Sequence, residues 1–465
     1  MTTDSPHEPT PGLFADRRSI GLMLCASVGV FAVQLDFFSV QTAVPIIADD
    51  LDSSPADLQW VVSGYMLAVA SCLIAAGRLA DLIGRRRVLI VGAVLFGVAS
   101  ALGGATSTPE LLIAMRLVQG AGAAVLFPVS LAIVTNAYPE ASVQRAVGAV
   151  FALGAIAQGI GPVFGGVVTE ALTWRWVFFV NIPLMIVLVL LAIRWVPDSR
   201  DDSVPPTIDW LGVGVIIASI ASFTYGVDRA GDWGWLSSGT AAFIGAGVIG
   251  LAVFIAIELR IDYPLLDLSL FRNRIFSVMT SAGSVANAGA TITIFYSMVL
   301  LQDVEHFSAL EAGIVFLTGA GGYTVAAFVS GRLERIPPWV VMTSALVVGG
   351  AASVVMGLVD SIVVYLVLAF FSMFGFGIGW SYTSVVTQSV VPARLAGAAS
   401  GTVLTILVGI GGVALAVATS MYTANTSAGA QNEGDVIRAI VLGTGVVALV
   451  ASAAVPLLGR ANRSS

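Results

Sequence analysis

Lysine is absent from this 465-residue chain, so arginine is its only strongly basic residue. A phosphate-binding P-loop needs a lysine on its nucleotide, and Schiff-base chemistry needs a lysine amine. Both are therefore excluded, and ATP hydrolysis by such a loop cannot be the energy source within this chain.

Cysteine and histidine are almost as scarce, with two of each. Cys25 and Cys72 fall inside apolar stretches, and His7 and His306 lie far apart. Neither a disulfide framework nor a metal cluster can be assembled from them. No deep group of histidine, serine and carboxylate residues forms a catalytic constellation either. We expect no metal, no cofactor and no enzymatic activity.

Charge is also rare: only 11% of residues are charged and 57% are hydrophobic, whereas soluble domains average about 25% charged residues. Apolar stretches of about 20 residues recur along the chain, which matches the thickness of a bilayer. Lipid must therefore be the solvent for most of it, and an all-α membrane protein is expected. The polar start of the chain is not typical of a cleavable signal, so the first apolar run is expected to be a spanning helix.

The apolar runs predict about fourteen transmembrane helices, separated by charged or Pro/Gly-rich breaks. Their approximate ranges are 19–45, 57–76, 86–105, 110–134, 144–168, 176–196, 208–227, 237–257, 275–301, 310–330, 338–359, 361–388, 396–422 and 436–458. The count depends on splitting two long runs, at Asp360 and at Trp174–Trp176. Both splits are reasonable because a charge at the bilayer centre costs about 2.5 to 3.5 kcal/mol.

The distribution of arginine supports this map, because cytoplasmic loops collect arginine. With a cytoplasmic N-terminus, the outer loops hold only Arg175, Arg229 and Arg438. The inner segments hold Arg17, Arg18, Arg78, Arg85, Arg86, Arg87, Arg145, Arg194, Arg200, Arg260, Arg272, Arg274, Arg332, Arg335, Arg394, Arg460 and Arg463. An even number of spans with both termini in the cytoplasm follows.

A faint internal repeat divides the chain: Gly77-Arg78-Leu79 after the second predicted helix recurs as Gly331-Arg332-Leu333 after the tenth. This predicts two related six-helix halves with two inserted helices between them, and a substrate site at the interface of the halves. The expected parts are a cytoplasmic N-terminus (1–18), an N-terminal half (19–197), a linker with the inserted pair (198–273), a C-terminal half (274–458) and a cytoplasmic tail (459–465).

Two ionisable residues lie deep within predicted spans, Asp36 and Arg116. Asp36 lies roughly 13 Å before Pro45, at the outer end of the first helix, and Arg116 lies roughly 10 Å into the fourth helix, which enters from the outside. Their depths match, so they could pair. One interpretation is a static ion pair of small net value; we favour a role in transport, because intramembrane charges are costly and usually functional.

The chemistry of Asp36 suggests how a proton gradient could drive transport. Burial favours its neutral form, whereas a nearby guanidinium or cationic cargo favours the carboxylate. Protons and cations would then compete: a proton from outside releases cargo, and its loss to the cytoplasm restores the site.

Two glycine-containing segments are candidates for conformational change. In the fifth predicted helix, Gly161, Pro162, Gly165 and Gly166 favour a bend or close helix contact, although such residues are common in membrane helices. The tight loop 77–87 contains Gly77, Asp81, Gly84, Arg85 and Arg86. Its charges either set topology alone or form a latch that engages when the inner gate closes.

Aromatic and amide side chains within spans could line a cavity for planar cations. Our candidates for substrate contact are Phe38, Gln41, Tyr65, Gln119, Phe127, Tyr296 and Trp380.

These segments together resemble the fourteen-helix drug/proton antiporter branch of the major facilitator superfamily. Leu35-Asp36 with Pro45 is similar to its first-helix motif, residues 77–87 to its loop motif, and Arg116 with Gln119-Gly120 to its helix-four proton-transfer motif. Gly161-Pro162 with Gly165-Gly166 resembles the helix-five antiporter motif, and Trp174–Pro183 is the most branch-specific stretch. The chain departs from the pattern at Gln41, usually Asn, at Ala157, usually Gly, and at Pro337-Pro338, which truncates the second Gly-Arg-Leu loop.

The resemblance implies a monomeric, multi-pass protein of the cytoplasmic (inner) membrane that exports amphipathic or cationic drugs and antibiotics in exchange for protons, with no cofactor and no nucleic-acid partner. One alternative keeps this mechanism but exports an endogenous metabolite, antibiotic, lipid or siderophore. A more remote alternative is a channel or a non-transporting membrane scaffold, for which a deep Asp–Arg pair would be unnecessary.

Overall fold

The computed structural model describes residues 16–459 except 54, 139, 199–208, 262–263, 267, 334–335, 392–395 and 427–431. Its helices are α1 (Arg17–Asp50), α2 (Pro55–Ile83), α3 (Arg85–Ala105), α4 (Pro109–Ala137), α5 (Glu140–Ala171), α6 (Arg175–Phe179), α7 (Asn181–Trp195), α8 (Trp210–Trp233), α9 (Ser238–Glu258), α10 (Arg274–Val299), α11 (Ala309–Ser330), α12 (Pro338–Met356), α13 (Ile362–Ser389), α14 (Ala396–Thr426) and α15 (Glu433–Gly459). A short 3₁₀ turn precedes α10 (Leu268–Arg272), and a π-helical turn follows it (Leu300–Val304).

The expected all-α membrane class is confirmed. Within the described residues, 12 helices are long and apolar enough to cross a membrane. Helices α2 and α5, of 29 and 32 residues, are not among those 12, and each contains side chains outside the described set. The total of fourteen spans therefore stays a prediction. The first part of the predicted segment 198–273, residues 199–208, lies outside the described residues, as do most of the N-terminal segment and the C-terminal tail.

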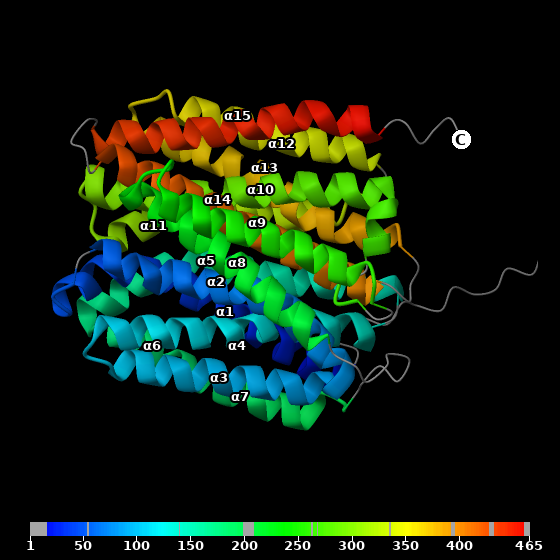
Figure 1. Cartoon of the computed structure of the whole chain (residues 1–465). Coiled ribbons are helices and arrows are strands. Elements are labelled where there is room, and N and C mark those ends of the chain that lie inside the picture. Colours follow the sequence, from blue (N-terminus) through cyan, green and yellow to red (C-terminus); the bar gives the residue numbers. More distant parts are fainter. Residues whose placement is uncertain are drawn as a thin grey trace, which may run out of the picture.

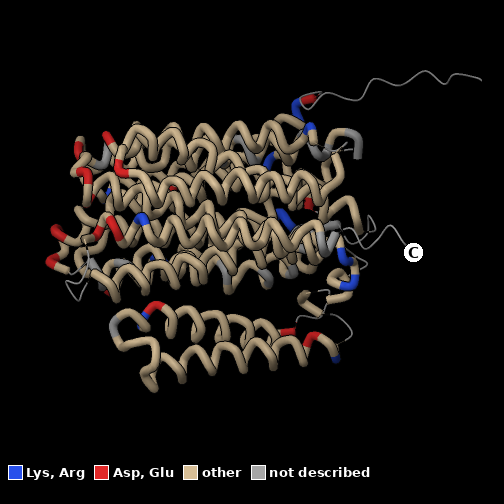
Figure 2. Tube along the Cα trace, turned by 90° about the horizontal axis from the view of Figure 1, so that it is seen from above, with Lys and Arg blue, Asp and Glu red and all other residues tan. Residues whose placement is uncertain are grey.

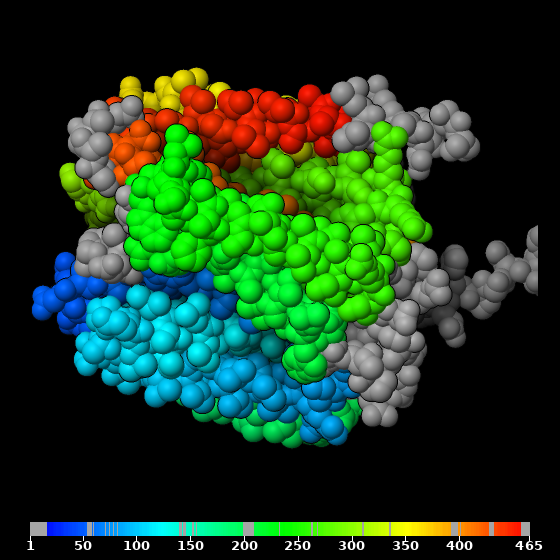
Figure 3. Space-filling model, viewed as in Figure 1, coloured from blue at the N-terminus to red at the C-terminus, as the bar shows by residue number. Residues whose placement is uncertain are grey.

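The helices form one bundle with roughly parallel axes, in which α1 to α7 pack on one another on one side and α10 to α15 on the other (Figure 1). The two sides meet mainly where α5 packs on α11 and α2 packs on α14. Helices α8 and α9 cross the seam between the two sides, as the green helices in the space-filling view show (Figure 3). Helix α9 lies farthest out: few of its residues are buried, among them Thr240, Gly247, Phe254 and Glu258.

The charges sort to the two ends of the bundle (Figure 2). One end, here called the arginine-rich end, carries the starts of α1, α3 and α10 with Arg17, Arg85 and Arg274. The opposite acidic end carries the end of α1 and the start of α15, with Asp50 and Glu433. An apolar middle between two charged ends is what a bilayer requires.

The segment 77–87 is more helical than expected. We predicted a loop joining two spans, but α2 continues to Ile83 and the chain turns at Gly84 alone. The residues after Gly77 are compatible with a helix, so nothing ends α2 before a residue that can adopt φ 110°, which is strained for any residue but glycine. The sixth predicted span is also divided, because Val180 separates the short α6 from α7.

Glycines of α5 allow close packing against two other helices. A methyl group at Gly161 would lie 2.7 Å from Cβ of Phe38, and one at Gly165 would lie 2.5 Å from the carbonyl oxygen of Ser39, both on α1. On α11, a methyl group at Gly313 would meet the backbone of Val163 at 2.7 Å. Gly166 and Pro162 are buried beside these contacts. We expected a bend or a close helix contact at these residues, and the structure shows the close contact.

Gly165→Leu is expected to lower the free energy of unfolding by about 1–3 kcal/mol, because the new side chain has no space against the α1 backbone. Gly148→Leu is the matched control, since a Cβ at Gly148 on the same helix meets nothing within 4 Å and should change stability by about 0.5 kcal/mol or less. SDS-induced unfolding in mixed micelles measures both. Equal stability of the two variants would contradict the packing argument.

Candidate functional site

Asp36 of α1 and Arg116 of α4 form an ion pair inside the N-terminal group of helices. Nη1 of Arg116 donates to Oδ2 of Asp36 at 2.6 Å, and both residues are 0% exposed. Nε of Arg116 donates to the carbonyl oxygen of Val61 on α2 at 2.8 Å. The structure thus brings together the two residues that the sequence singled out by depth, and it ties three helices to them.

Three polar side chains complete the surroundings of the carboxylate. Gln119 donates to Oδ1 of Asp36 at 2.8 Å, and Asn181 donates to the same oxygen at 2.7 Å. Ser100 accepts from both amides and donates to the carbonyl oxygen of Phe178. Both carboxylate oxygens therefore have donors, which is what a charge removed from water requires.

Sequence reasoning missed Ser100 and Asn181 as members of this group. A signal for Asn181 was available, since it is a polar residue inside the distinctive stretch Trp174–Pro183 and within an apolar run. The break at Val180 starts α7 at Asn181, which is fully buried. Ser100 carried no comparable signal, because serine is common in membrane helices.

Tyr65 of α2 covers the guanidinium. The guanidinium carbon of Arg116 lies 4.1 Å from the centroid of the Tyr65 ring, and Tyr65 is 2% exposed. Three buried polar atoms around the pair have no hydrogen-bond partner among the described residues: Nη2 of Arg116, Oδ1 of Asn181 and the Tyr65 hydroxyl. Both oxygens of Asp36 thus accept hydrogen bonds, whereas these three neighbouring polar atoms would be free to form hydrogen bonds if the side chains moved.

A central cavity with about 1120 Å³ of space lies between the two groups of helices. Its polar lining comes mainly from the amides Gln34, Gln41, Gln158 and Asn287, and the described lining contains no Asp, Glu or Arg. Among the predicted substrate contacts, five line this cavity: Phe38, Gln41, Tyr65, Phe127 and Trp380. Aromatic faces and amides can hold a cation or a polar aromatic molecule without a full charge.

The structure does not bring the other two predicted substrate contacts into the lining. Gln119 is buried beside Asp36. Tyr296 is fully buried 5.7 Å from the ring of Tyr422, whereas its neighbour Phe295 lines the cavity. Successive residues of a helix point about 100° apart, so only one of these two can face the cavity.

Asp36 and Arg116 do not line the cavity either, although Tyr65 contacts both the cavity and Arg116. The ring of Tyr65 also stacks on Phe37, another lining residue, with centroids 5.9 Å apart. One aromatic layer therefore separates the space for a cargo molecule from the buried ion pair.

The predicted latch around 77–87 is only partly described. The side chain of Asp81 lies outside the described residues, so its expected pairing stays a prediction. Gly77 has open space at its Cβ position, Gly84 makes the turn, and Arg85 and Arg86 are half-buried at the arginine-rich end. One ion pair at this end joins Arg87 to Asp198, at 3.1 Å and largely exposed, and such a pair contributes little stability.

Arg116→Gln is expected to destabilise the protein by about 3–5 kcal/mol, because it leaves the Asp36 carboxylate buried without its cation. The double variant Asp36→Asn/Arg116→Gln should lose less stability than the single one, since no unpaired charge remains. Detergent-based unfolding of both variants measures the difference. A double variant as unstable as the sum of Arg116→Gln and Asp36→Asn would show that the two groups are not coupled.

Comparisons with known proteins agree with this architecture. The sequence pattern of the Major Facilitator Superfamily matches residues 26–416. The multidrug efflux pump LfrA of Mycolicibacterium smegmatis is 31% identical over 80% of this chain and 74% of its own length. The tetracenomycin C resistance and export protein of Streptomyces glaucescens is 32% identical over 71% of this chain; the match spans 62% of that protein, less than two thirds. The human organic anion transporter MFSD10 has a similar fold, with a TM-score of 0.66 at 14% identity over 94% of this chain and 100% of its own.

Proposed function

This chain belongs to the Major Facilitator Superfamily, and we propose that it is a proton-coupled antiporter that exports amphipathic or cationic drugs and antibiotics across the cytoplasmic membrane. The observation that carries the proposal is the buried Asp36–Arg116 pair, one aromatic ring away from a cavity of about 1120 Å³. Relatives named as a multidrug efflux pump and as an antibiotic resistance and export protein support the choice of cargo.

The proton would act on Asp36. When the carboxylate binds a proton it loses its charge, and the 2.6 Å bond from Arg116 loses its ionic character. Nη2 of Arg116 already lacks a hydrogen-bond acceptor among the described residues. With a weaker bond to Asp36, the guanidinium would move toward other acceptors and so change its position against the Tyr65 ring. A change at Asp36 would in this way reach the cavity wall.

Cargo would bind among the aromatic and amide side chains rather than at Asp36 itself. The described lining contains no carboxylate, so cargo and proton would not compete directly for Asp36. Cargo in the cavity would instead affect Asp36 through Tyr65. A planar cation against Tyr65 and Phe37 would lie on the other side of the ring from the positive charge of Arg116. An added positive charge near Asp36 favours its carboxylate form, so cargo binding would release the proton.

The energy source is the proton gradient, without a cofactor, and the working unit is a monomer. The arginine-rich end faces the cytoplasm by the positive-inside rule, which puts both termini there. Protons would enter from the acidic end and move toward the cytoplasm, while cargo leaves in the opposite direction, against its own concentration gradient.

Export of an antibiotic made by the cell itself is the second candidate, by the same mechanism. The relative named for both resistance to and export of tetracenomycin C favours keeping it. Metabolite output of a deletion strain, compared with its drug resistance, separates the two cargo types.

Asp36→Asn is expected to reduce proton-driven dye efflux from proteoliposomes at least about tenfold under an imposed pH gradient, because the amide cannot bind and release the proton. Asp52→Asn is the matched control, with the same loss of charge at an exposed site whose φ of 47° asparagine tolerates. Full proton-driven efflux by Asp36→Asn would rule out this residue as the coupling site.

Tyr65 tests the link between cavity and ion pair. Tyr65→Phe should retain most coupling, because the Tyr65 hydroxyl has no partner in the described structure, whereas Tyr65→Leu removes the ring face over Arg116. We expect Tyr65→Leu to bind dye with an affinity within about fivefold of wild type but to lose dye-induced proton release in detergent. Normal proton release by Tyr65→Leu would contradict coupling through the ring.

A further inference from the structure

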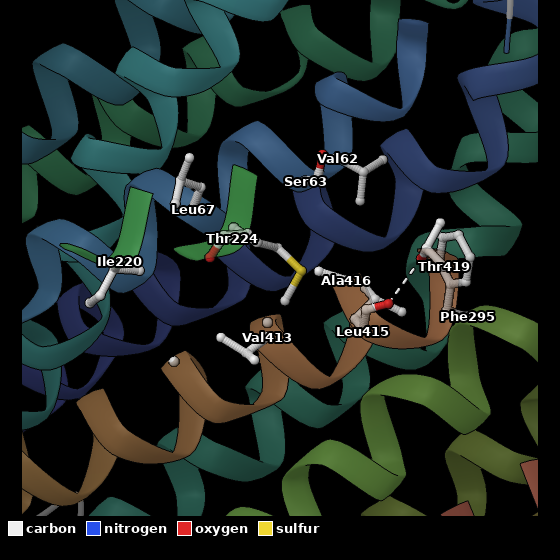
Figure 4. Close-up of a pocket in the computed structure, with 13 residues that line it drawn as sticks. Val62, Ser63, Leu67, Ile220, Thr224, Phe295, Val413, Leu415, Ala416 and Thr419 are labelled. Atoms are coloured by element: carbon white, nitrogen blue, oxygen red, sulfur yellow. Dashed lines mark hydrogen bonds between the residues drawn. The ribbon is translucent and has the colours of Figure 1, made fainter. Parts of the chain in front are cut away.

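A second pocket lies on the side of the bundle, where α8 crosses the seam between α2 and α14 (Figure 4). We call it the seam pocket; it is partly open, and about 500 Å³ of space lies within it and its mouth. Figure 4 shows side chains from α2, such as Val62 and Leu67, facing those of α14, such as Val413 and Ala416. The remaining lining residues are Ser63, Met66, Ile220, Thr224, Phe295, Gly409, Gly412, Leu415 and Thr419.

The seam pocket is apolar, in contrast to the central cavity. Its described lining holds no charged or amide side chain, and the hydroxyl of Thr419 is used within its own helix, donating to the carbonyl oxygen of Leu415 at 2.9 Å. The four amides that give the central cavity its polarity are all absent from this lining. A polar headgroup would find few partners here, whereas a hydrocarbon chain needs none.

Three side chains belong to both spaces: Met66, Phe295 and Leu415 line the seam pocket and the central cavity. The two spaces are therefore neighbours with a shared wall rather than separate features. Unbranched methionine changes shape easily, which suits it to a wall that must open.

The depth of the seam pocket puts it inside the hydrocarbon layer. Met66 lies 11 residues after the start of α2 at Pro55, and Leu415 lies 11 residues before the end of α14 at Thr426, so each is about 17 Å from the acidic end. The hydrocarbon core is about 30 Å thick, which places the shared wall near its middle.

Helix α8 secures the seam above this pocket, toward the acidic end. The rings of Trp60 on α2 and Tyr225 on α8 lie 5.6 Å apart. Gly231 of α8 packs against α14 so closely that a methyl group would lie 3.0 Å from the carbonyl oxygen of Ser420. One helix thus touches both groups of helices at the seam, and its residues Ile220 and Thr224 also line the pocket.

We propose that the seam pocket binds the hydrocarbon tail of an amphipathic cargo molecule and that Met66, Phe295 and Leu415 form a lateral portal, through which the cargo passes from the bilayer into the central cavity. This rests on the proposed export function. The headgroup occupies the amide-lined cavity and the tail the apolar seam, so the cargo class is a single-chain amphiphile already dissolved in the membrane. The inserted helix α8 supplies one side of the portal.

Filling the pocket tests the assignment. Gly409 lines the pocket and a Cβ there meets nothing within 4 Å, so a side chain can start at this position, and the ring of Gly409→Phe would take up space in the pocket. Gly443→Phe is the matched control, with equally open space on α15 and away from the pocket. Proton-coupled export of alkyltrimethylammonium ions with tails of 6 to 16 carbons is measured in proteoliposomes. We expect Gly409→Phe to lose at least tenfold for the 14- and 16-carbon ions, to change less than twofold for the 6-carbon ion, and Gly443→Phe to match wild type.

Equal losses for short and long tails, or no loss for either, would overturn the portal. Failure of wild type to move both these ions and the dyes would instead reject the export function, so the two failures are distinguishable.

A second measurement covers the case in which Gly409→Phe does not fold. Thr224→Cys, in a background with Cys25→Ala and Cys72→Ala, places a small thiol in the pocket wall on α8. A lipid-soluble maleimide should label it, and hexadecyltrimethylammonium should slow labelling at least fivefold, whereas the 6-carbon ion should not. Labelling unaffected by the long-chain ion would contradict binding of the tail at this site.

Discussion

A charge that leaves water for the hydrocarbon layer must find all its partners within the protein, and this constraint governs the N-terminal group of helices. Asp36 has donors on both carboxylate oxygens, supplied by side chains of α4 and α7, and Arg116 reaches the backbone of α2. These contacts join four helices, α1, α2, α4 and α7, so one small polar cluster holds all four together. Removing one member of the pair would leave the other charge buried and unpaired, which costs about 3–5 kcal/mol.

The cluster and the cavity are connected because α1, α2 and α4 serve both. One face of α1 carries Asp36 toward Arg116, and the adjacent positions Phe37, Phe38 and Gln41 face the cavity. A helix that presents charge on one side and a binding surface on another transmits a small rotation to both. Helix α5 packs closely on α1 and α11 through glycines, so these three helices meet at their backbones rather than through long side chains.

Helices α8 and α9 lie at the seam between the two groups of helices. Helix α8 contacts both sides of the seam, whereas α9 packs on α8 and presents exposed apolar residues such as Ile249 and Val253 outward. A helix that is apolar on its exposed face is stable only in lipid, so α9 extends the protein into the bilayer. If the cargo dissolves in the membrane, as proposed, α8 and α9 lie where the cargo would pass from lipid to protein.

The amino-acid sequence by itself determined the fold class and the depth of the charges, because hydropathy and the cost of intramembrane charge act locally along the chain. It also picked out Asp36, Arg116 and most of the aromatic lining by these local rules. It did not predict that α2 continues to Ile83, since only the backbone conformation at Gly84 ends that helix. Only the tertiary structure showed that Ser100 and Asn181 belong to the cluster and that Tyr296 does not line the cavity. The seam pocket likewise became visible only there. Each of these depends on how one helix is rotated against another, and that rotation is set by contacts between residues far apart in the chain.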